Sequence, residues 1–103
     1  MAVQVAWSES SLASLSEAID YIAKDSPSYA AALAVQAERA GASLHEFAHR
    51  GRVVPEYKDP AVREIAVGKS YRLIYKAESE QVSIIAFVHS ARDLESFIES
   101  TGW

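Results

Sequence analysis

The run REIAVGKSYRLIYKAESEQVSIIAFVHSARDL, from Arg63 to Leu94, decides the fold. It contains three segments rich in β-branched and aromatic residues, separated by short stretches of glycine, serine, lysine and glutamate. Strands joined by such short turns pair with their neighbours in the chain. The run therefore predicts an antiparallel β-meander on which the rest of the chain packs.

Residue alternation indicates which side chains of the meander are buried. Tyr71, Leu73 and Tyr75 share an apolar face, because successive side chains of a strand point to opposite sides. In the last segment both faces carry bulk under strict alternation, with Val82, Ile84, Ala86 and Val88 on one face and Ser83, Ile85, Phe87 and His89 on the other. This pattern is typical of an interior strand.

Alternation does not assign all charged residues of the meander to one face of the sheet. Arg63 shares a face of the first segment with Ile65 and Val67. Alternation alone does not fix whether Arg63, Arg72 and His89 share one side of the sheet.

The first quarter of the chain predicts a strand and a helix. Residues 3–7 alternate large apolar side chains with small or polar ones, which indicates a short strand. Ser8 is a typical N-cap, and the helix that follows is expected to end near Asp25. Its apolar stripe comprises Leu12, Leu15, Ile19 and Ile22.

A second helix is expected from Pro27 to about His49. Ser26 caps it, and Pro27 occupies the first turn, where no amide donor is needed. Gly41 indicates a bend or close packing, and Gly51 is suited to end the helix. Its expected buried side comprises Leu33, Ala37, Ala40, Leu44 and Phe47.

The remaining segments complete an α+β fold. Val53–Pro60 is expected to be a loop or an irregular edge, and Ser90 caps a short last helix on which Leu94, Phe97 and Ile98 share a face. Trp103 is either a lid on the core or an exposed contact. We expect a single domain, 1–103, with a short N-terminal strand, an antiparallel helix pair on the apolar face of the meander and a short C-terminal helix.

Composition limits the class of protein. The chain has 103 residues, of which 50% are hydrophobic, and it has no cysteine. No apolar run approaches the roughly 20 residues that span a bilayer, and residues 1–7 do not resemble a signal peptide. We therefore expect a cytoplasmic protein without disulfides.

The charge distribution is uneven along the chain. A net charge of −4 argues against a nucleic-acid partner held mainly through phosphates. Basic residues nevertheless outnumber acidic ones between Arg50 and Lys76. This segment is consistent with a locally positive sheet edge on an acidic body, although for each single residue solvated surface charge is the favoured interpretation.

One short motif suggests a metal site. His45-Glu46-Phe47-Ala48-His49 matches the His-Glu-x-x-His pattern of zinc peptidases, in which two histidines one helical turn apart bind zinc. It would lie in the last turn of the second helix, with Phe47 in the packing stripe and no third ligand following. We expect no metal here.

An ordered set of motifs resembles the RelE/ParE superfamily, the toxins of type II toxin–antitoxin modules, and within it ParE. The motifs are Trp7-Ser8, Tyr21-Ile22-Ala23, Asp25-Ser26-Pro27, Gly51-Arg52-Val53, Pro55-Glu56, Arg63-Glu64-Ile65, Tyr71-Arg72-Leu73-Ile74-Tyr75 and His89-Ser90-Ala91-Arg92-Asp93-Leu94. They follow the order of the family over nearly the whole chain.

The resemblance implies two candidate activities. RelE-type toxins cut mRNA in the ribosome, and basic residues at comparable positions stabilise charge at the scissile bond. Ile65 stands here where RelE has a second sheet lysine, and Ile98 stands where it has a catalytic tyrosine. His89 followed by Arg92-Asp93, together with the long helix pair, resembles ParE, whose members inhibit DNA gyrase.

We therefore expect a ParE-like toxin that inhibits DNA gyrase, blocks replication and is neutralised by a ParD-like cognate antitoxin. It would be no enzyme and need no cofactor, and it would not contact nucleic acid or membrane directly. The residues expected to bind the target are Arg63, Arg72, His89 and Arg92. The alternatives are a RelE-like ribosome-dependent endoribonuclease, with the same four residues as its catalytic set, and an inactive relative that only binds antitoxin.

Overall fold

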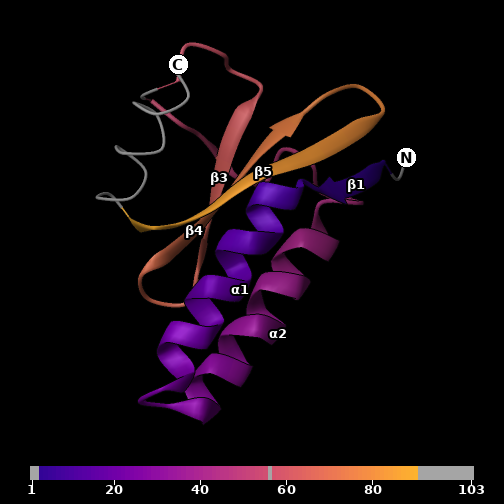
Figure 1. Cartoon of the computed structure of the whole chain (residues 1–103). Helices are drawn as coiled ribbons and strands as arrows, with labels where there is room; N and C mark the ends of the chain where they lie inside the picture. The colour runs from indigo at the N-terminus through magenta and orange to yellow at the C-terminus, as the bar shows by residue number, and fades with distance from the viewer. Residues whose placement is uncertain (1–2, 56, 91–103) are drawn as a thin grey trace.

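The computed structural model describes residues 3–55 and 57–90, which contain two helices and five strands. In chain order these are β1 (Gln4–Trp7), α1 (Glu9–Ala23), α2 (Pro27–Ser43), β2 (Arg52–Val53), β3 (Val62–Val67), β4 (Tyr71–Ala77) and β5 (Gln81–His89). Figure 1 shows α1 and α2 side by side against one face of a single sheet. The expected α+β architecture is confirmed.

The last three strands form the predicted antiparallel meander. The sheet order is β1-β5-β4-β3-β2, with β4 in the centre and β1 running parallel to β5 at one edge. Gly68 makes the turn between β3 and β4 with a φ of 63°, a left-handed conformation that side chains with a Cβ rarely adopt. The opening strand thus pairs with the last one, and β5 is interior as expected.

A β-bulge breaks the alternation expected for β5. Ile74 pairs with Ala86 whereas Tyr75 pairs with Ile84, so Ile85 is the extra residue. A bulge reverses the side to which the following residues point. As a result Ile84 and Phe87 both join the core beneath the helices, while Ala86 lies on the other face. The prediction of strict alternation in this strand was wrong.

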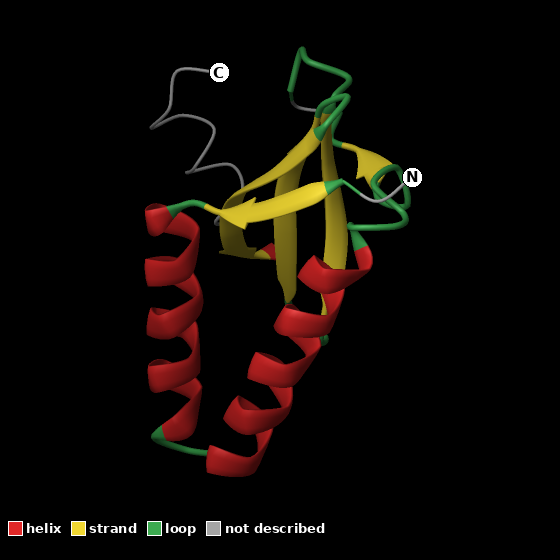
Figure 2. Cartoon of the chain, turned by 90° about the vertical axis from the view of Figure 1, so that its right-hand side faces the viewer, coloured by secondary structure: helices red, strands yellow, loops and turns green. Residues whose placement is uncertain are grey.

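Both helices begin where the sequence predicts. The Ser8 Oγ accepts a hydrogen bond from the Ser11 amide at 3.0 Å, and the Ser26 Oγ accepts one from the Tyr29 amide at 3.4 Å. Pro27 lies in the first turn of α2. In Figure 2 the two helices run beyond the sheet, and their connecting turn lies at the end farthest from the strands.

Helix α2 ends at Ser43, earlier than the expected His49. The cause is tertiary, because the following segment pairs with the start of the chain. The Val3 amide donates to the His45 carbonyl at 2.9 Å, and the His45 Nδ1 lies 2.7 Å from the Val3 carbonyl. Leu44 is fully buried at the turn, whereas Phe47, expected in the core, is 61% exposed.

Two glycines allow close approach of the backbone. A Cβ on Gly41 would lie 3.0 Å from the Trp7 ring, so the close packing predicted for this position is confirmed. A Cβ on Gly51 would lie 2.6 Å from the Glu64 carbonyl oxygen. We expected Gly51 to end α2, and this prediction was wrong, because α2 ends at Ser43. Gly51 instead lets the chain enter β2 directly against β3.

The two faces of the sheet carry separate apolar clusters. Beneath the helices, Leu33 and Ala37 pack on Leu73 and Tyr75, the face that alternation in β4 predicts. On the opposite face the loop after β2 packs against the sheet, in a cluster of Val54, Tyr57, Val62, Ile74, Ala86 and Val88. The segment predicted as a loop or irregular edge thus covers part of the far face.

Helix α1 packs more loosely than its stripe predicts. Leu15 and Ile22 are only partly buried against the core, and Leu12 is 50% exposed. The last helix and Trp103 lie outside the described residues. No helix in the part of the chain that the structure describes is long and apolar enough to cross a bilayer.

Candidate functional site

The sheet separates the residues that the sequence suggested as a site. Arg63 pairs across the strands with Tyr75, and Arg72 pairs with Val88. Tyr75 belongs to the cluster beneath the helices and Val88 to the cluster on the far face. Cross-strand partners point to the same side. Arg63 and Arg72 therefore lie on opposite faces, and Arg92 lies outside the described residues.

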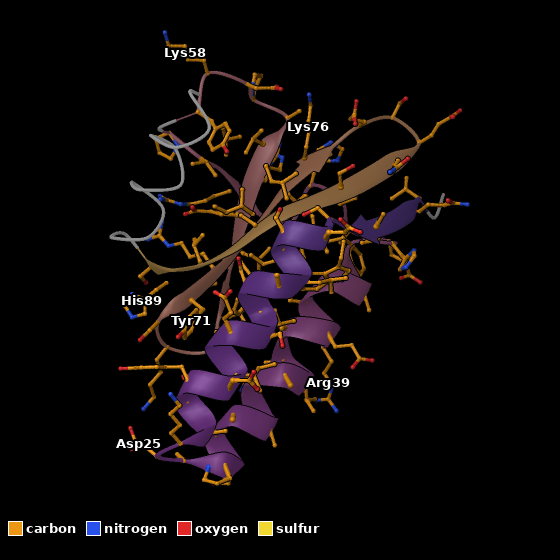
Figure 3. All side chains as sticks on the ribbon, in the orientation of Figure 1. Asp25, Arg39, Lys58, Tyr71, Lys76 and His89 are labelled. Atoms are coloured by element: carbon orange, nitrogen blue, oxygen red, sulfur yellow. The ribbon has the colours of Figure 1, made fainter. Side chains whose placement is uncertain are left out.

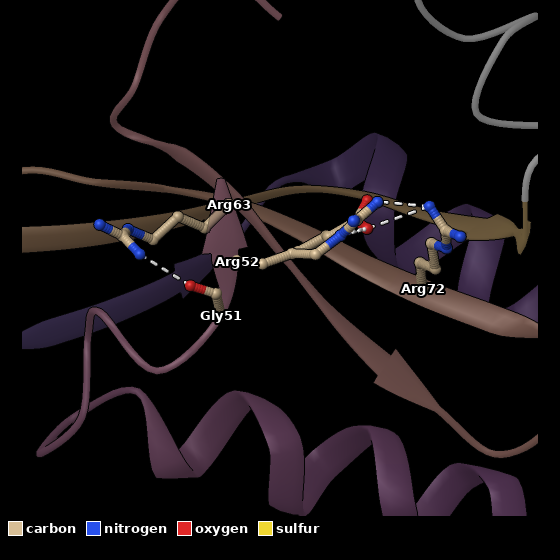
Figure 4. A network of polar contacts seen from close by, with 5 residues as sticks. Gly51, Arg52, Arg63 and Arg72 are labelled. Atoms are coloured by element: carbon tan, nitrogen blue, oxygen red, sulfur yellow. Dashed lines mark hydrogen bonds and ion pairs between the residues drawn. The ribbon is translucent and has the colours of Figure 1, made fainter. Parts of the chain in front are cut away.

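Arg63 holds the connection between α2 and β2. Its Nη1 donates to the Gly51 carbonyl at 2.7 Å (Figure 4). The same nitrogen donates to the His49 carbonyl at 3.3 Å. Both acceptors are backbone carbonyls of the segment that connects α2 to β2. The guanidinium group of Arg63 thus holds the backbone in place where the chain enters β2.

Tyr75 reinforces the same connection from within the core. Its fully buried hydroxyl accepts a hydrogen bond from the Gly51 amide at 2.9 Å. Burial raises the pKa of the Tyr75 hydroxyl, while the Gly51 hydrogen bond and the nearby Arg63 and Arg50 oppose the rise. Gly51 is therefore held by Tyr75 through its amide and by Arg63 through its carbonyl. A larger residue would not fit at this position.

A network of two arginines and one carboxylate lies on the far face. The Arg72 Nη1 contacts both Glu64 carboxylate oxygens at 3.0 and 3.1 Å, and the Arg52 Nε contacts Oε1 at 2.6 Å (Figure 4). The Glu64 side chain is only 5% exposed, so its charge requires such partners. Two guanidinium groups on one carboxylate leave a net positive charge.

Sequence reasoning missed Glu64 and Arg52 as partners of Arg72. A glutamate among the basic residues of 50–76 was the available signal, but only the strand register brings the three together. Arg52 is level with Glu64 across β2 and β3. Arg72 is level with Ala66, two residues farther along β3 and on the same face.

His89 lies with aromatic residues at the other end of β4. Its ring makes an edge contact with Tyr71 at 5.3 Å between centroids, and Tyr71 stacks on Phe87 at 5.2 Å. Figure 3 shows Tyr71 and His89 together at this end of the sheet. Arg63 is level with Tyr75 in β4, whereas His89 is level with Tyr71 at the start of that strand. The structure therefore does not bring Arg63 and His89 together.

The zinc-peptidase motif does not have the geometry that its chemistry needs. Residues 45–49 follow the end of α2, so they do not present two histidines on one helical face. The His45 Nδ1 contacts the Val3 carbonyl. Within 3–55 and 57–90 no group of three or more histidine, aspartate or glutamate side chains could hold a metal ion.

Two shallow hollows meet at the edge of β3. One is lined on the far face by Arg50, Gly51, Arg52, Glu64, Ile65, Ala66 and Arg72. The other lies between α2 and β3 and is lined by Gln36, Arg39, Ala40, Arg50, Ile65, Ala66, Val67, Gly68 and Lys69. The described residues that line them supply five cations and one carboxylate, so this edge carries the positive charge that the charge distribution suggests.

Comparisons with known proteins agree on the kind of molecule. Residues 5–94 match the family described as ParE toxin of the type II toxin–antitoxin system parDE. The chain is 34% identical over 89 residues to the protein named Toxin RelE2 of Caulobacter vibrioides, covering 86% of this chain and 97% of that protein.

The fold also has a solved counterpart. A chain of the chromosomal ParDE TA system from P. aeruginosa superimposes with a TM-score of 0.70 at 16% sequence identity. The match covers 84% of this chain and 95% of that one. At this identity the likeness concerns the fold alone.

Proposed function

We propose a function for this chain from one premise: it belongs to the ParE toxin family of type II toxin–antitoxin systems. On that basis it acts as a growth-arresting toxin that binds and inhibits DNA gyrase in the cytoplasm. A cognate antitoxin of the ParD type neutralises it. Inhibition works through binding, with no reaction catalysed by the chain.

The observation that carries this proposal is the extent of the family match. It covers residues 5–94, which include both helices, β2 to β5 and all of β1 except its first residue. The family match thus concerns the whole described fold and not the meander alone.

The placement of the charged residues favours binding over hydrolysis. Phosphodiester cleavage needs a base, an acid and cations around one phosphate. Here Arg63 is committed to backbone carbonyls and Arg72 to Glu64, on opposite faces of the sheet. Arg72 and His89 remain partly accessible at the surface, and they are candidate contacts with gyrase together with Arg92.

The relative named Toxin RelE2 keeps the mRNA endoribonuclease as the second candidate. The two activities differ in what they change inside a cell. Gyrase inhibition alters the superhelical density of plasmid DNA and leaves transcripts intact, whereas ribosome-dependent cleavage does the reverse.

The test is induction of the chain in bacterial cells, alone and with its antitoxin. The proposal predicts growth arrest, relaxed plasmid and uncut transcripts, all reversed by the antitoxin. Arg72→Ala and Arg92→Ala should each weaken arrest, while Lys58→Ala, at an exposed position on the loop after β2, should not.

Cut transcripts with normally supercoiled plasmid would overturn the proposal in favour of the endoribonuclease. Antitoxin binding without any growth arrest would identify the chain as an inactive member of the family.

A further inference from the structure

The edge strand β2 covers only part of β3. It pairs with Arg63 and Glu64 alone, whereas β3 continues through Ile65 and Ala66 to Val67. These three residues have β4 as their single strand neighbour in the part of the chain that the structure describes. An uncovered strand edge is a template for pairing with an added strand.

The direction of the backbone groups identifies Ala66 as the open position. The Val62 carbonyl accepts from the Val54 amide, which lies on the β2 side, and the Ala61 carbonyl accepts from Ala77, which follows β4. Because these directions alternate along a strand, Ala66 directs its N–H and C=O away from β4. Ala66 is also exposed and lines both hollows.

Positive charge flanks this edge on both sides. Arg39 and Lys69 line the hollow next to α2, Arg52 and Arg72 line the hollow on the far face, and Arg50 lines both. Glu64, the one carboxylate among the described residues that line the hollows, is already paired with Arg52 and Arg72. This concentration occurs on a chain whose net charge is −4.

We propose that the Ile65–Val67 edge of β3 binds an extended acidic segment of a partner protein, which adds to the sheet as a further strand. Main-chain hydrogen bonds to Ala66 would hold the segment. Successive side chains of a strand point to opposite faces. Adjacent acidic residues would therefore reach both hollows, one toward Arg39 and Lys69 and the next toward Arg52 and Arg72.

A protein segment fits this edge better than a nucleic acid. Both hollows are lined by Ile65 and Ala66. Among the described residues that line them there is no aromatic side chain on which a base could stack. The proposal is also independent of gyrase, because it concerns the edge of the sheet and not the toxic activity.

Binding of a labelled peptide to the purified full chain tests the proposal. The probe is fluorescein-labelled Thr-Val-Glu-Glu-Val-Glu-Thr with blocked ends, measured by fluorescence anisotropy. One control peptide has lysine in place of each glutamate, and a second has alternate backbone amides N-methylated. A fluorescein-labelled oligouridylate provides the nucleic-acid comparison.

The acidic peptide should bind, and the lysine peptide should not. Arg39→Glu combined with Lys69→Glu should weaken binding by about tenfold or more, because like charges would then face each other. Lys58→Glu, a matched reversal on the loop after β2, should leave the affinity unchanged. Figure 3 shows Lys58 on the far side of the sheet from Arg39, well apart from it.

Two changes test the strand pairing itself. N-methylation of the probe and Ala66→Pro in the chain each remove an edge donor, and both should weaken binding. Proline is tolerated at an edge position whose N–H does not serve the ladder, and the N-methylated probe needs no variant to fold.

The proposal is overturned if the acidic peptide does not bind, or if N-methylation of the probe leaves its affinity unchanged. It is also overturned if the oligouridylate binds more tightly and the Arg39 and Lys69 reversals weaken that binding, which would make this a nucleic-acid surface. If the chain binds the acidic peptide but does not inhibit gyrase, the proposed function fails while this inference stands.

Discussion

Arg72 binds Glu64 through a single guanidinium nitrogen that lies 3.0 and 3.1 Å from the two carboxylate oxygens. Arg52 approaches the same carboxylate from the edge strand. Glu64 and its two arginines therefore link β2, β3 and β4 on the face opposite the helices. It also fixes the position of the cations that line the far-face hollow.

Removal of the Glu64 charge should destabilise this face. Glu64→Gln keeps the shape but weakens hydrogen bonds that now involve two charged partners, so we expect a loss of about 1–3 kcal/mol in the free energy of unfolding. Arg52 is largely exposed, which keeps the loss below that of a fully buried ion pair.

Urea denaturation measures this loss. Glu78→Gln, at an exposed position after β4, is the matched control and should change stability by less than about 0.5 kcal/mol. Equal stability of the two variants would show that the Glu64 network contributes nothing to folding.

Tyr75 should make stability fall at alkaline pH. Its pKa is raised by burial above the ordinary value of 10.0, so the folded state retains a proton that the unfolded state releases. The contribution of this shift to the free energy of unfolding is complete below the pKa that Tyr75 has in the unfolded chain. It is lost as the pH rises from there through the pKa of Tyr75 in the folded chain.

Comparison with Tyr75→Phe isolates this effect. The variant should be less stable near neutral pH by about 1–3 kcal/mol, because the buried Gly51 amide loses its acceptor. Its stability should then decline less steeply above pH 10 than that of the parent chain, as measured by urea unfolding across the alkaline range. Tyr21→Phe, at a 70% exposed site, should follow the parent curve.

The two tightly packed glycines should differ in their response to alanine. In Gly51→Ala the new Cβ would meet the Glu64 carbonyl, which the sheet fixes in place, and we expect a loss of about 1–3 kcal/mol. In Gly41→Ala it would meet the Trp7 ring at 3.0 Å, and the helix gains about 1 kcal/mol in propensity. Thermal unfolding should therefore rank Gly51→Ala well below Gly41→Ala, and the reverse order would contradict the packing described here.

Arg63 should matter for folding more than for target binding. Arg63→Ala removes the clamp on the Gly51 and His49 carbonyls, so we expect a loss of about 1–3 kcal/mol in the free energy of unfolding. Gyrase inhibition by the folded fraction should stay close to that of the parent chain, as a titration corrected for unfolded protein would show. A variant of parental stability that no longer inhibits would instead place Arg63 in the contact.

Local signals in the sequence predicted local structure well. The Ser8 and Ser26 caps place both helix starts, because a cap depends on residues within one turn. Alternation in 71–76 correctly identifies the face under the helices. The confirmed positive edge follows from the excess of basic residues between Arg50 and Lys76.

The failures arise where distant parts of the chain interact. The end of α2 depends on the pairing of His45 with Val3, and the bulge at Ile85 depends on the register between β4 and β5. The separation of Arg63 from Arg72 depends on how each strand is oriented in the sheet. No single segment contains that information, so the four candidate residues could be named but not placed.

The most direct test of the central claim is supercoiling of relaxed plasmid by purified gyrase while the chain is titrated in. We predict concentration-dependent inhibition, with a shift of about tenfold to higher concentration for Arg72→Ala or Arg92→Ala and no shift for Lys58→Ala. Undisturbed supercoiling by a preparation that cleaves ribosome-bound mRNA would contradict the account.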